Sequence, residues 1–479
     1  MTQIFAFRGI TYNRKKVGDY SRILTQPYDK IDDKLQAVYY RKSKYNHIRI
    51  TKPKKYQTDT ETNSIYTRAA ECFRGWLKSG VLVPDKKPTI YAYYQTYADP
   101  SSPHSTPHTP HSLKTRKGFI ALGQLVEFGK GVHPHERTLL GPKVDRLNMM
   151  RAVGGSTGQI FMLYSDPKLQ VNYLLDKAAT RCPPDIIARD EYDVQHKVWK
   201  IQDQTLNKQI SRLMVDKEVF IADGHHRYET ALNYRNEMRA KGAKSIEPES
   251  YNNRMMTFIN MDDTEGLSIL PTHRLVYGLK GFSLGGIFRK LQKYFEVKEY
   301  PYTDKKSQNL ARGDMLDDLR ILGNYGHSFG MVVKGRRKYY LLTLRDEKLM
   351  AKVVKEKHSP AWKQLDVTIL HSLVIEHLLG ISKEKVAGEE NIAYRRGADE
   401  VISEVEKGKY QLAFLMNPTR ISEVKEVASK GEKMPQKSTD FYPKLLSGIV
   451  ISKINFLDRR NLSKQIKQIK RINRKLHLS

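Results

Sequence analysis

The side chains with the clearest chemical meaning lie in one short segment, which contains Asp223, Gly224, His225, His226 and Arg227. The apolar run before it, 218–223, predicts a short buried strand, and the residues after it repeat apolar positions at helical spacing. A strand, a glycine turn and a helix start would direct free backbone N–H groups and the positive helix end at one point, which favours an anion. Arg227 adds a planar, charged fork for phosphate, and the two histidines add donors whose charge changes near neutral pH. The segment predicts a phosphate or nucleotide site; the alternative is that Asp223 is only an N-cap and the histidines are buried structural groups.

A second cluster follows the predicted strand 118–128. Glu136 is a candidate general base, because a carboxylate held among histidines and cations can accept a proton. Three nearby cations are candidate anion clamps, namely Arg137, Lys143 and Arg146. The spacing of His133, His135 and Glu136 also allows a metal site with these three side chains as ligands. A solvated turn is the remaining alternative.

A third cluster lies in the loop 433–445, where Lys437, Ser438 and Thr439 stand side by side between prolines. Ammonium, hydroxyl and backbone donors in such a row could bind a carboxylate or a phosphate. Most loops of this kind are ordinary connections, so the cluster carries weight only together with the other two.

The elements that must position these clusters are of mixed type. Tyr- and Ile-containing strands flank the loop 99–112, which is rich in proline and serine and predicts a long hairpin connection. That loop holds His104, His108 and His111, for which a solvated loop is favoured over a metal site because no Cys or carboxylate joins them. Further on, the sequence predicts short strands at 158–164, helices at 284–295 and 365–379, and a hairpin at 329–344. We expect one domain over 1–280 and a mixed α/β domain over 281–452 that contributes the loop 433–445.

Composition limits the class of protein. The chain has 479 residues, two cysteines that form no CxxC pair, and a formal net charge of +31. A disulfide framework and a thiolate zinc site are therefore excluded, and anionic partners are favoured. The N-terminus does not read as a signal peptide and no apolar run is long enough to span a bilayer, so we expect a cytoplasmic protein.

The last segment, 453–479, has nine Lys or Arg and one Asp. Leu462, Ile466, Ile469, Ile472 and Leu476 recur at helical spacing, which predicts a basic amphipathic helix. Such a helix either docks on the body of the protein or contacts nucleic acid or an anionic membrane.

Long segments of the chain resemble a known family. The sequence contains FRGI, QPYDKI, HERTLLGPKVDR, STGQIFMLYSD, VFIADGHHRYETALNYR, LPTHRLV, LDVTILHSLVIEHLLGI, AFLMNPTRISEVKEVA and MPQKSTDFYPKLLSG. These resemble the bacterial and archaeal family catalogued as domain of unknown function 1015, over roughly residues 4 to 451. The basic segment 453–479 lies outside the resemblance, and the loop 99–112 looks like an insertion.

The motifs PHE, DGHHR and KST also resemble, in the same order, those of the archaeal free-serine kinases. Those enzymes belong to the ParB/sulfiredoxin-like fold group and phosphorylate free L-serine with a nucleotide donor. The resemblance implies that Glu136 is the catalytic glutamate and that residues 223–227 form the nucleotide-phosphate loop. It also implies that Lys437 and Thr439 lie near the acceptor. The residues after KST read DFYP, which departs from the kinase pattern and leaves the acceptor open.

We therefore expect an α+β protein with a ParB/sulfiredoxin-like nucleotide-binding core, an additional mixed α/β C-terminal domain and a basic C-terminal helix. The expected function is a small-molecule phosphotransferase that uses ATP or ADP and Mg²⁺ to phosphorylate a free, serine-like hydroxy acid. Asp223 would be a direct or water-mediated ligand of the metal. Two alternatives remain: a ParB-like, nucleotide-dependent DNA-binding or regulatory protein, and a metal-dependent phosphohydrolase that uses the HxHE cluster.

Overall fold

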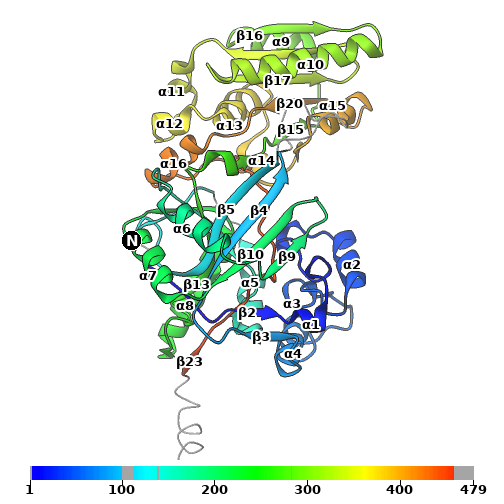
Figure 1. Ribbon diagram of the computed structural model, residues 1–479. Coiled ribbons are helices and arrows are strands. Elements are labelled where there is room, and N and C mark those ends of the chain that lie inside the picture. The colour runs from blue at the N-terminus through cyan, green and yellow to red at the C-terminus, as the bar shows by residue number, and fades with distance from the viewer. Residues whose placement is uncertain (1–2, 100–112, 137–139, 282, 458–479) are drawn as a thin grey trace, which may run out of the picture.

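Two β-sheets, each covered by helices, organise the chain (Figure 1). The computed structural model describes residues 3–99, 113–136, 140–281 and 283–457. We call the larger sheet with its helices the first unit, and the smaller sheet with its helices the second unit. In Figure 1 the second unit lies above the first. The expected α+β class is confirmed. In the part of the chain that is described, no helix has the length and apolar character needed to cross a membrane.

The first sheet has the strand order β6-β11-β8-β13-β5-β4-β10-β9, and β1 also pairs with β5. Its strands are β1 (Ile4–Phe5), β4 (Ile90–Ala98), β5 (Leu113–Gln124), β6 (Val132–Pro134), β8 (Ile160–Tyr164), β9 (Ile186–Arg189), β10 (Gln195–Ile201), β11 (Val219–Asp223) and β13 (Asn253–Asn260). β4 and β5 pair antiparallel, so the predicted hairpin is confirmed at its two strands. Residues 100–112 of its connection, with His104, His108 and His111, lie outside the described residues.

One parallel pair at the edge of this sheet positions the candidate site. β6 pairs parallel with β11, with Val219 opposite Val132 and Ile221 opposite Pro134. The strands of a parallel pair end at the same edge of their sheet. The residues that follow the two strands, Glu136 and Gly224, therefore emerge on the same side.

The helices of the first unit pack on this sheet and beside it. They are α1 (Arg14–Val17), α2 (Asp33–Lys42), α3 (Ile48–Thr51), α4 (Ile65–Lys78), α5 (Leu140–Val153), α6 (Gln170–Ala179), α7 (Gln204–Met214) and α8 (His225–Ala240). α8 begins directly after β11, as the sequence predicts, because Gly224 adopts the left-handed conformation (φ 96°, ψ 29°) that turns the chain. Buried Tyr228, Ala231 and Leu232 hold α8 on the sheet.

The second sheet has the strand order β16-β18-β17-β20-β15-β19. Its strands are β15 (His273–Val276), β16 (Phe295–Pro301), β17 (Ser328–Val333), β18 (Lys338–Leu344), β19 (Ile392–Arg395) and β20 (Leu412–Met416). Its helices are α9 (Leu284–Leu291), α10 (Lys305–Leu322), α11 (Met350–Val353), α12 (Pro360–Lys363), α13 (Asp366–Thr368), α14 (Lys383–Ala387), α15 (Ala398–Glu406) and α16 (Ile421–Ser429), with a π-helical stretch at Ile369–Leu378. The predicted helix 284–295 ends four residues early, at Leu291, because Phe295 instead begins β16 and pairs with Leu344 of β18.

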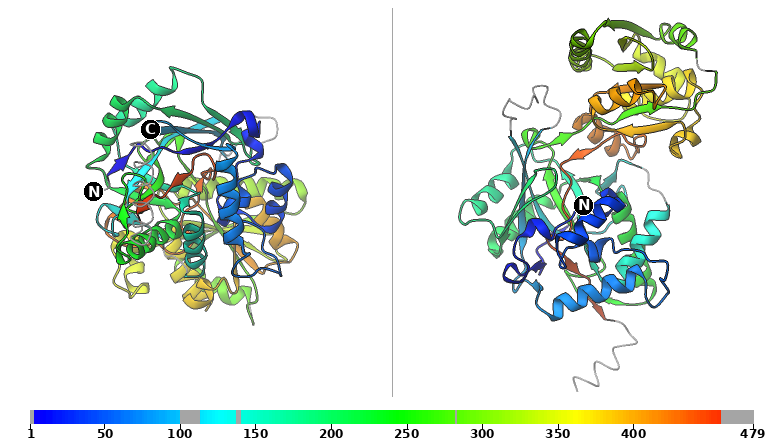
Figure 2. Two further views of the ribbon diagram at one scale, coloured as in Figure 1. Left: turned by 90° about the horizontal axis from the view of Figure 1, so that it is seen from below. Right: turned by 90° about the vertical axis from the view of Figure 1, so that its right-hand side faces the viewer.

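The chain then returns from the second unit to the first. Short pairings fix the returning segment along the first unit, through β7 (Gly155–Ser156), β12 (Lys244–Ser245), β14 (Ser268–Ile269), β21 (Phe441–Tyr442), β22 (Ser452–Lys453) and β23 (Phe456–Leu457). β2 (Ile10–Tyr12), which pairs with β3 (Leu82–Pro84), also bridges to Ile451 of this segment. In the right-hand view of Figure 2 the segment runs down from the upper unit and ends at the bottom of the lower one. Residues 453–457 of the predicted basic tail therefore form β23, the end of β22 and the two residues between them, and the rest of the tail lies outside the described residues.

Candidate functional site

A cavity of about 1070 Å³ lies where the two parallel strand ends, the second unit and the returning segment meet. Among the described residues, its walls contain ten Lys or Arg side chains and six Asp or Glu side chains. The first unit contributes Lys30, Lys52, Lys54, Lys55, Glu136, Arg146 and 222–227, the second contributes Tyr394, Arg395 and Arg396, and the returning segment contributes Lys437, Thr439, Asp440 and Lys444. An excess of cations in a concave site favours an anionic ligand.

The turn between β11 and α8 forms one wall of this cavity. Gly224 provides no side-chain cap for α8, so the first backbone N–H groups of the helix are left for a ligand or water. Arg227 folds back over the turn, where its Nη2 donates to Asp223 Oδ2 at 2.6 Å and its Nη1 donates to the carbonyl of Gln159. A Cβ on Gly224 would lie only 2.9 Å from Arg227 Nε, so only glycine fits beneath this guanidinium.

Glu136 lines the same cavity from the end of β6. Burial and the neighbouring Asp223 charge raise the pKa of Glu136 to about 7, although Lys444, Lys437 and Lys30 act in the opposite direction. Within the described residues its carboxylate makes no hydrogen bond or ion pair. A carboxylate of this kind can hold or release a proton near neutral pH.

The pKa of Asp223 is shifted in the opposite direction from that of Glu136. Burial opposes its charged form, but Lys444, Arg227 and Lys30 hold the pKa of this carboxyl well below its usual range. Lys444 Nζ lies 3.8 Å from Asp223 Oδ1 and 2.9 Å from Asp440 Oδ1. Arg396 Nη2 in turn donates to Asp440 Oδ1 at 2.9 Å, so an alternating row of charges links the second unit to the strand end.

His135 connects β6, β11 and the returning segment. Its Nδ1 donates to the carbonyl of Ile221 at 2.5 Å, and its Nε2 lies 2.6 Å from Thr439 Oγ1. Burial lowers the pKa of His135 to about 4, so the ring is neutral and Nε2 accepts from the Thr439 hydroxyl. The backbone N–H of His135 donates to His225 Nε2 at 3.3 Å. His135 therefore acts as a structural hydrogen-bonding group, and His225, which lines the cavity, accepts one hydrogen bond from it.

The structure does not support the alternative of a metal site formed by His133, His135 and Glu136. His133 stacks on Phe220, with ring centroids 5.0 Å apart, and its Nε2 lies 3.3 Å from Glu218 Oε1. His135 has both ring nitrogens engaged in hydrogen bonds. The residues that the structure describes contain no group of three or more His, Cys, Asp or Glu side chains that could hold a metal. The three side chains are close in sequence but lie in three different environments.

Asp223 also does not fit a direct magnesium site. One of its oxygens accepts from Arg227 and the other faces Lys444. A metal bound there would have to share this carboxylate with two cations. Mg²⁺ is commonly held by one or two carboxylates with waters and substrate phosphates, and Asp223 is not free to be one of these carboxylates.

The candidate anion clamps Arg146 and Lys143 differ in whether they line the cavity. Arg146 lines the cavity, where its Nε donates to Asp145 Oδ2 at 2.8 Å and its guanidinium lies over the Tyr28 ring at 4.1 Å. Lys143 pairs with Glu229 and does not line the cavity, so its predicted clamp position is not supported. Arg137 lies outside the described residues.

The residues Lys437, Ser438 and Thr439 also differ in whether they line the cavity. Lys437 lines the cavity, with its Nζ 3.5 Å from Glu389 Oε1, and Thr439 lines it beside His135. Ser438 points elsewhere, because its buried hydroxyl donates to the carbonyl of Pro435 at 2.6 Å. Two of the three predicted donors thus reach the cavity.

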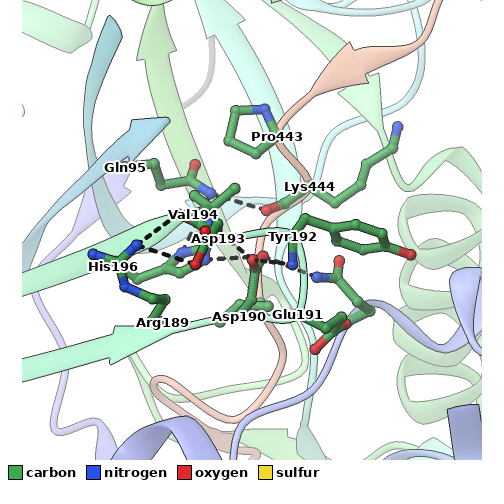
Figure 3. Close-up of polar contacts among 12 residues, drawn as sticks. Gln95, Arg189, Asp190, Glu191, Tyr192, Asp193, Val194, His196, Pro443 and Lys444 are labelled. Carbon is green, nitrogen blue, oxygen red and sulfur yellow. Dashed lines mark hydrogen bonds and ion pairs between the residues drawn. The ribbon is translucent and has the colours of Figure 1, made fainter. Parts of the chain in front are cut away.

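A buried polar network holds the returning segment in register (Figure 3). Gln95 Nε2 donates to the carbonyl of Lys444 at 2.9 Å, and Arg116 donates to the carbonyls of Tyr442 and Pro443. Figure 3 shows His196 and Asp190 beside this contact, and the Lys444 side chain extends away from them. The backbone is thus fixed from one side while the ammonium group is directed to Asp223.

Among the charged side chains at the cavity that sequence reasoning missed are four that act on Asp223 or on its neighbours, namely Lys30, Arg396, Asp440 and Lys444. Lys30 lies in the segment QPYDKI, and Asp440 and Lys444 lie in the segment MPQKSTDFYPKLLSG. Both segments carry the family resemblance, so that resemblance was the signal that could have found them. Arg396 had no comparable signal.

Comparison with known proteins gives remote structural likenesses. A free serine kinase in complex with AMP is 13% identical, with a TM-score of 0.31, and covers 71% of this chain and 90% of its own. A conserved hypothetical protein from Pyrococcus furiosus is 14% identical, with a TM-score of 0.29, and covers 71% and 94%. SbnI from Staphylococcus aureus, truncated at its C-terminus, is 11% identical, with a TM-score of 0.30, and covers 68% and 85%. A comparison with curated proteins finds no match. The family described as "Protein of unknown function (DUF1015)" matches residues 4–368, and the chain therefore belongs to this family.

Proposed function

We propose that this protein is a nucleotide-dependent phosphotransferase that phosphorylates a small, serine-like hydroxy acid. The observation that carries the proposal is the meeting of Glu136, with a pKa raised to about 7, and the open N-terminus of α8 in one cation-rich cavity. For phosphoryl transfer a protein must position the donor and the acceptor and neutralise the phosphate charge. It must also provide a group that takes the proton of the acceptor hydroxyl. The ParB/sulfiredoxin-like character of the core is part of this proposal, and the order of the PHE, DGHHR and KST motifs supports it.

The donor phosphates would bind at the start of α8. The backbone N–H groups of its first turn and the positive end of the helix favour a phosphate there. His226 lines the cavity at this turn, and its buried Nδ1 has no hydrogen-bond partner among the described residues. Lys30 and Arg146 also line the cavity and would neutralise further phosphate charge. ATP or ADP would be the donor, and Mg²⁺ bound to its phosphates would offset their negative charge.

Glu136 would take the proton from the acceptor hydroxyl. As that O–H bond breaks, the acceptor oxygen bonds to the terminal phosphorus, and the bond from phosphorus to the bridging oxygen breaks. The electron pair of that bond leaves with the shortened nucleotide. A base with a pKa near the working pH is partly deprotonated before the reaction and still accepts a proton readily.

The acceptor's polar end would lie against the returning segment. Lys437, Thr439 and Lys444 line this side of the cavity, and the charge of Lys444 is divided between Asp223 and Asp440. A carboxylate on the acceptor matches the ammonium group of Lys437. The Thr439 hydroxyl donates its proton to His135, so it can only accept a hydrogen bond from the acceptor. A free hydroxy amino acid or a related hydroxy acid has both the carboxylate and the hydroxyl that this geometry requires.

The test is a product assay with the full chain. The protein is incubated with Mg²⁺, ATP or ADP and a panel of hydroxy acids, and the products are identified by mass spectrometry, with nucleotide binding measured separately by calorimetry. We expect one phosphorylated hydroxy acid and an equal amount of the shortened nucleotide. If no nucleotide binds and no acceptor reacts, the proposal is wrong. If nucleotide binds but is only hydrolysed, the donor site stands and the acceptor assignment fails.

A further inference from the structure

A second, smaller cavity of about 30 Å³ adjoins the candidate site. Tyr28, Arg146 and Arg227 line both cavities, and Arg254 and Thr230 line only the small one. Among the described residues that line it there are three arginines and no Asp or Glu. The cavity is therefore strongly positive and has no carboxylate in its walls.

Arg254 lacks the counter-charge that the other two arginines have. Arg227 donates to Asp223 at 2.6 Å and Arg146 donates to Asp145 at 2.8 Å. Arg254 is 6% exposed, and within the described part of the chain its Nε and Nη1 have no hydrogen-bond partner and its guanidinium has no ion pair. Thr230, 1% exposed, likewise has a hydroxyl without a partner there.

An uncompensated guanidinium in the interior is costly. Burial, helped by the nearby Arg227 charge, lowers the pKa of Arg254 to about 9, which still leaves it charged at neutral pH. A water molecule would satisfy an N–H group but would leave that charge unbalanced. A cavity needs about 10–15 Å³ of such space to hold one water, so this one has room for a single small ion and not for a nucleotide phosphate group with its substituents.

We propose that this small cavity binds a halide ion, chloride under physiological conditions, between the Arg254 guanidinium and the Thr230 hydroxyl. A halide supplies the missing negative charge and accepts from several donors without a fixed geometry. It also tolerates the side chains of Met149 and Met150, which are among the other residues of the wall. The ion would be a structural part of the first unit, next to the cavity assigned to the nucleotide and separate from it.

The decisive experiment is crystallographic. Crystals of the full chain are grown in sodium bromide, and anomalous scattering locates the ion. We expect a bromide peak within hydrogen-bonding distance of Arg254 and Thr230, which persists when nucleotide and Mg²⁺ are added. A water molecule in place of the peak overturns the proposal. Displacement of the peak by nucleotide also overturns it, because the occupant would then be a phosphate oxygen of the ligand in the main cavity.

Solution measurements provide an independent arm. Thermal unfolding is followed in sodium chloride, sodium bromide and sodium gluconate at equal ionic strength. We expect the unfolding midpoint to rise saturably with chloride and bromide but not with gluconate. Arg254→Met should lose this rise. The control Arg289→Met, at an exposed residue of α9, should keep it. If Arg254→Met does not fold, Thr230→Val provides the test through a lower bromide occupancy. Equal midpoints in the three salts contradict the proposal.

Discussion

Glu136 follows β6 and Asp223 is the last residue of the neighbouring parallel strand β11, and although both line the same cavity their pKa values move in opposite directions. Asp223 is surrounded by Lys444, Arg227 and Lys30, whose charges outweigh the effect of burial. Glu136 has no direct ion pair among the described residues, so burial and the charge of Asp223 dominate there. One carboxylate is thereby kept ionised as part of the scaffold, and the other is free to exchange a proton.

Glu136→Gln should preserve nucleotide binding and reduce phosphoryl transfer. The amide has almost the shape of the carboxylate but does not act as a base near neutral pH, and general-base contributions are about 10²- to 10⁴-fold. The measurement is product formation under saturating nucleotide, with binding checked by calorimetry. Glu71→Gln, on the exposed face of α4, is the matched control. A Glu136→Gln protein as active as the wild type would remove Glu136 from the role of base.

The rate should depend on the ionisation of Glu136. The carboxylate form is the active one and its pKa is raised to about 7, so kcat/KM should fall as the pH drops below that value. Above it the rate should level off as the carboxylate becomes fully ionised. In Glu136→Gln this acidic limb should disappear from the residual activity. An unchanged limb in the variant would assign the titration to another group.

Gly224→Ala should destabilise the first unit and weaken nucleotide binding. The new Cβ would meet Arg227 Nε at 2.9 Å, and the backbone φ of +96° is unfavourable for alanine. Backbone strain of this kind costs about 1–3 kcal/mol. Gly313→Ala, within α10 and with no atom near its Cβ position, is the control and should instead stabilise by about 0.5–1 kcal/mol. Denaturant unfolding measures both, and equal effects of the two substitutions would contradict this account.

Lys444→Met should lower stability substantially, because it leaves Asp223 and Asp440 without their shared cation. Removing one partner from a buried ion pair costs about 3–5 kcal/mol. Lys86→Met, at an exposed position, is the control. The comparison is made by thermal and urea unfolding at pH 7. At lower pH the loss should diminish, as protonation neutralises the two carboxylates, and a pH-independent loss would argue that packing dominates.

Deletion of residues 458–479 should leave nucleotide binding intact and reduce binding to anionic vesicles or DNA. The segment carries eight Lys or Arg and one Asp, so its removal should also weaken the dependence of such binding on salt. A longer deletion from residue 453 should in addition destabilise the protein, because it removes β22, β23 and the buried Ile454. Vesicle and DNA binding that is unchanged by the shorter deletion would exclude the tail as the contact.

Local patterns in the sequence are enough to predict part of this arrangement. The succession of the apolar strand β11, the turn at Gly224 and the helix α8 is encoded in consecutive residues. The hairpin of β4 and β5 is encoded locally as well. The division between His133 and His135 could not be seen, because it depends on Phe220 and Glu218 in one case and on Ile221 and Thr439 in the other. His135 and Thr439 are 304 residues apart, and no local pattern specifies such a contact.

The path of the returning segment has a consequence for synthesis of the chain on the ribosome. The first unit receives Thr439, Asp440 and Lys444 only after the whole second unit has been translated. Until then, the Asp223 carboxylate lacks Lys444 and His135 lacks Thr439. A nascent or prematurely terminated chain therefore carries an incomplete site, and any activity would arise only in molecules translated at least past Lys444.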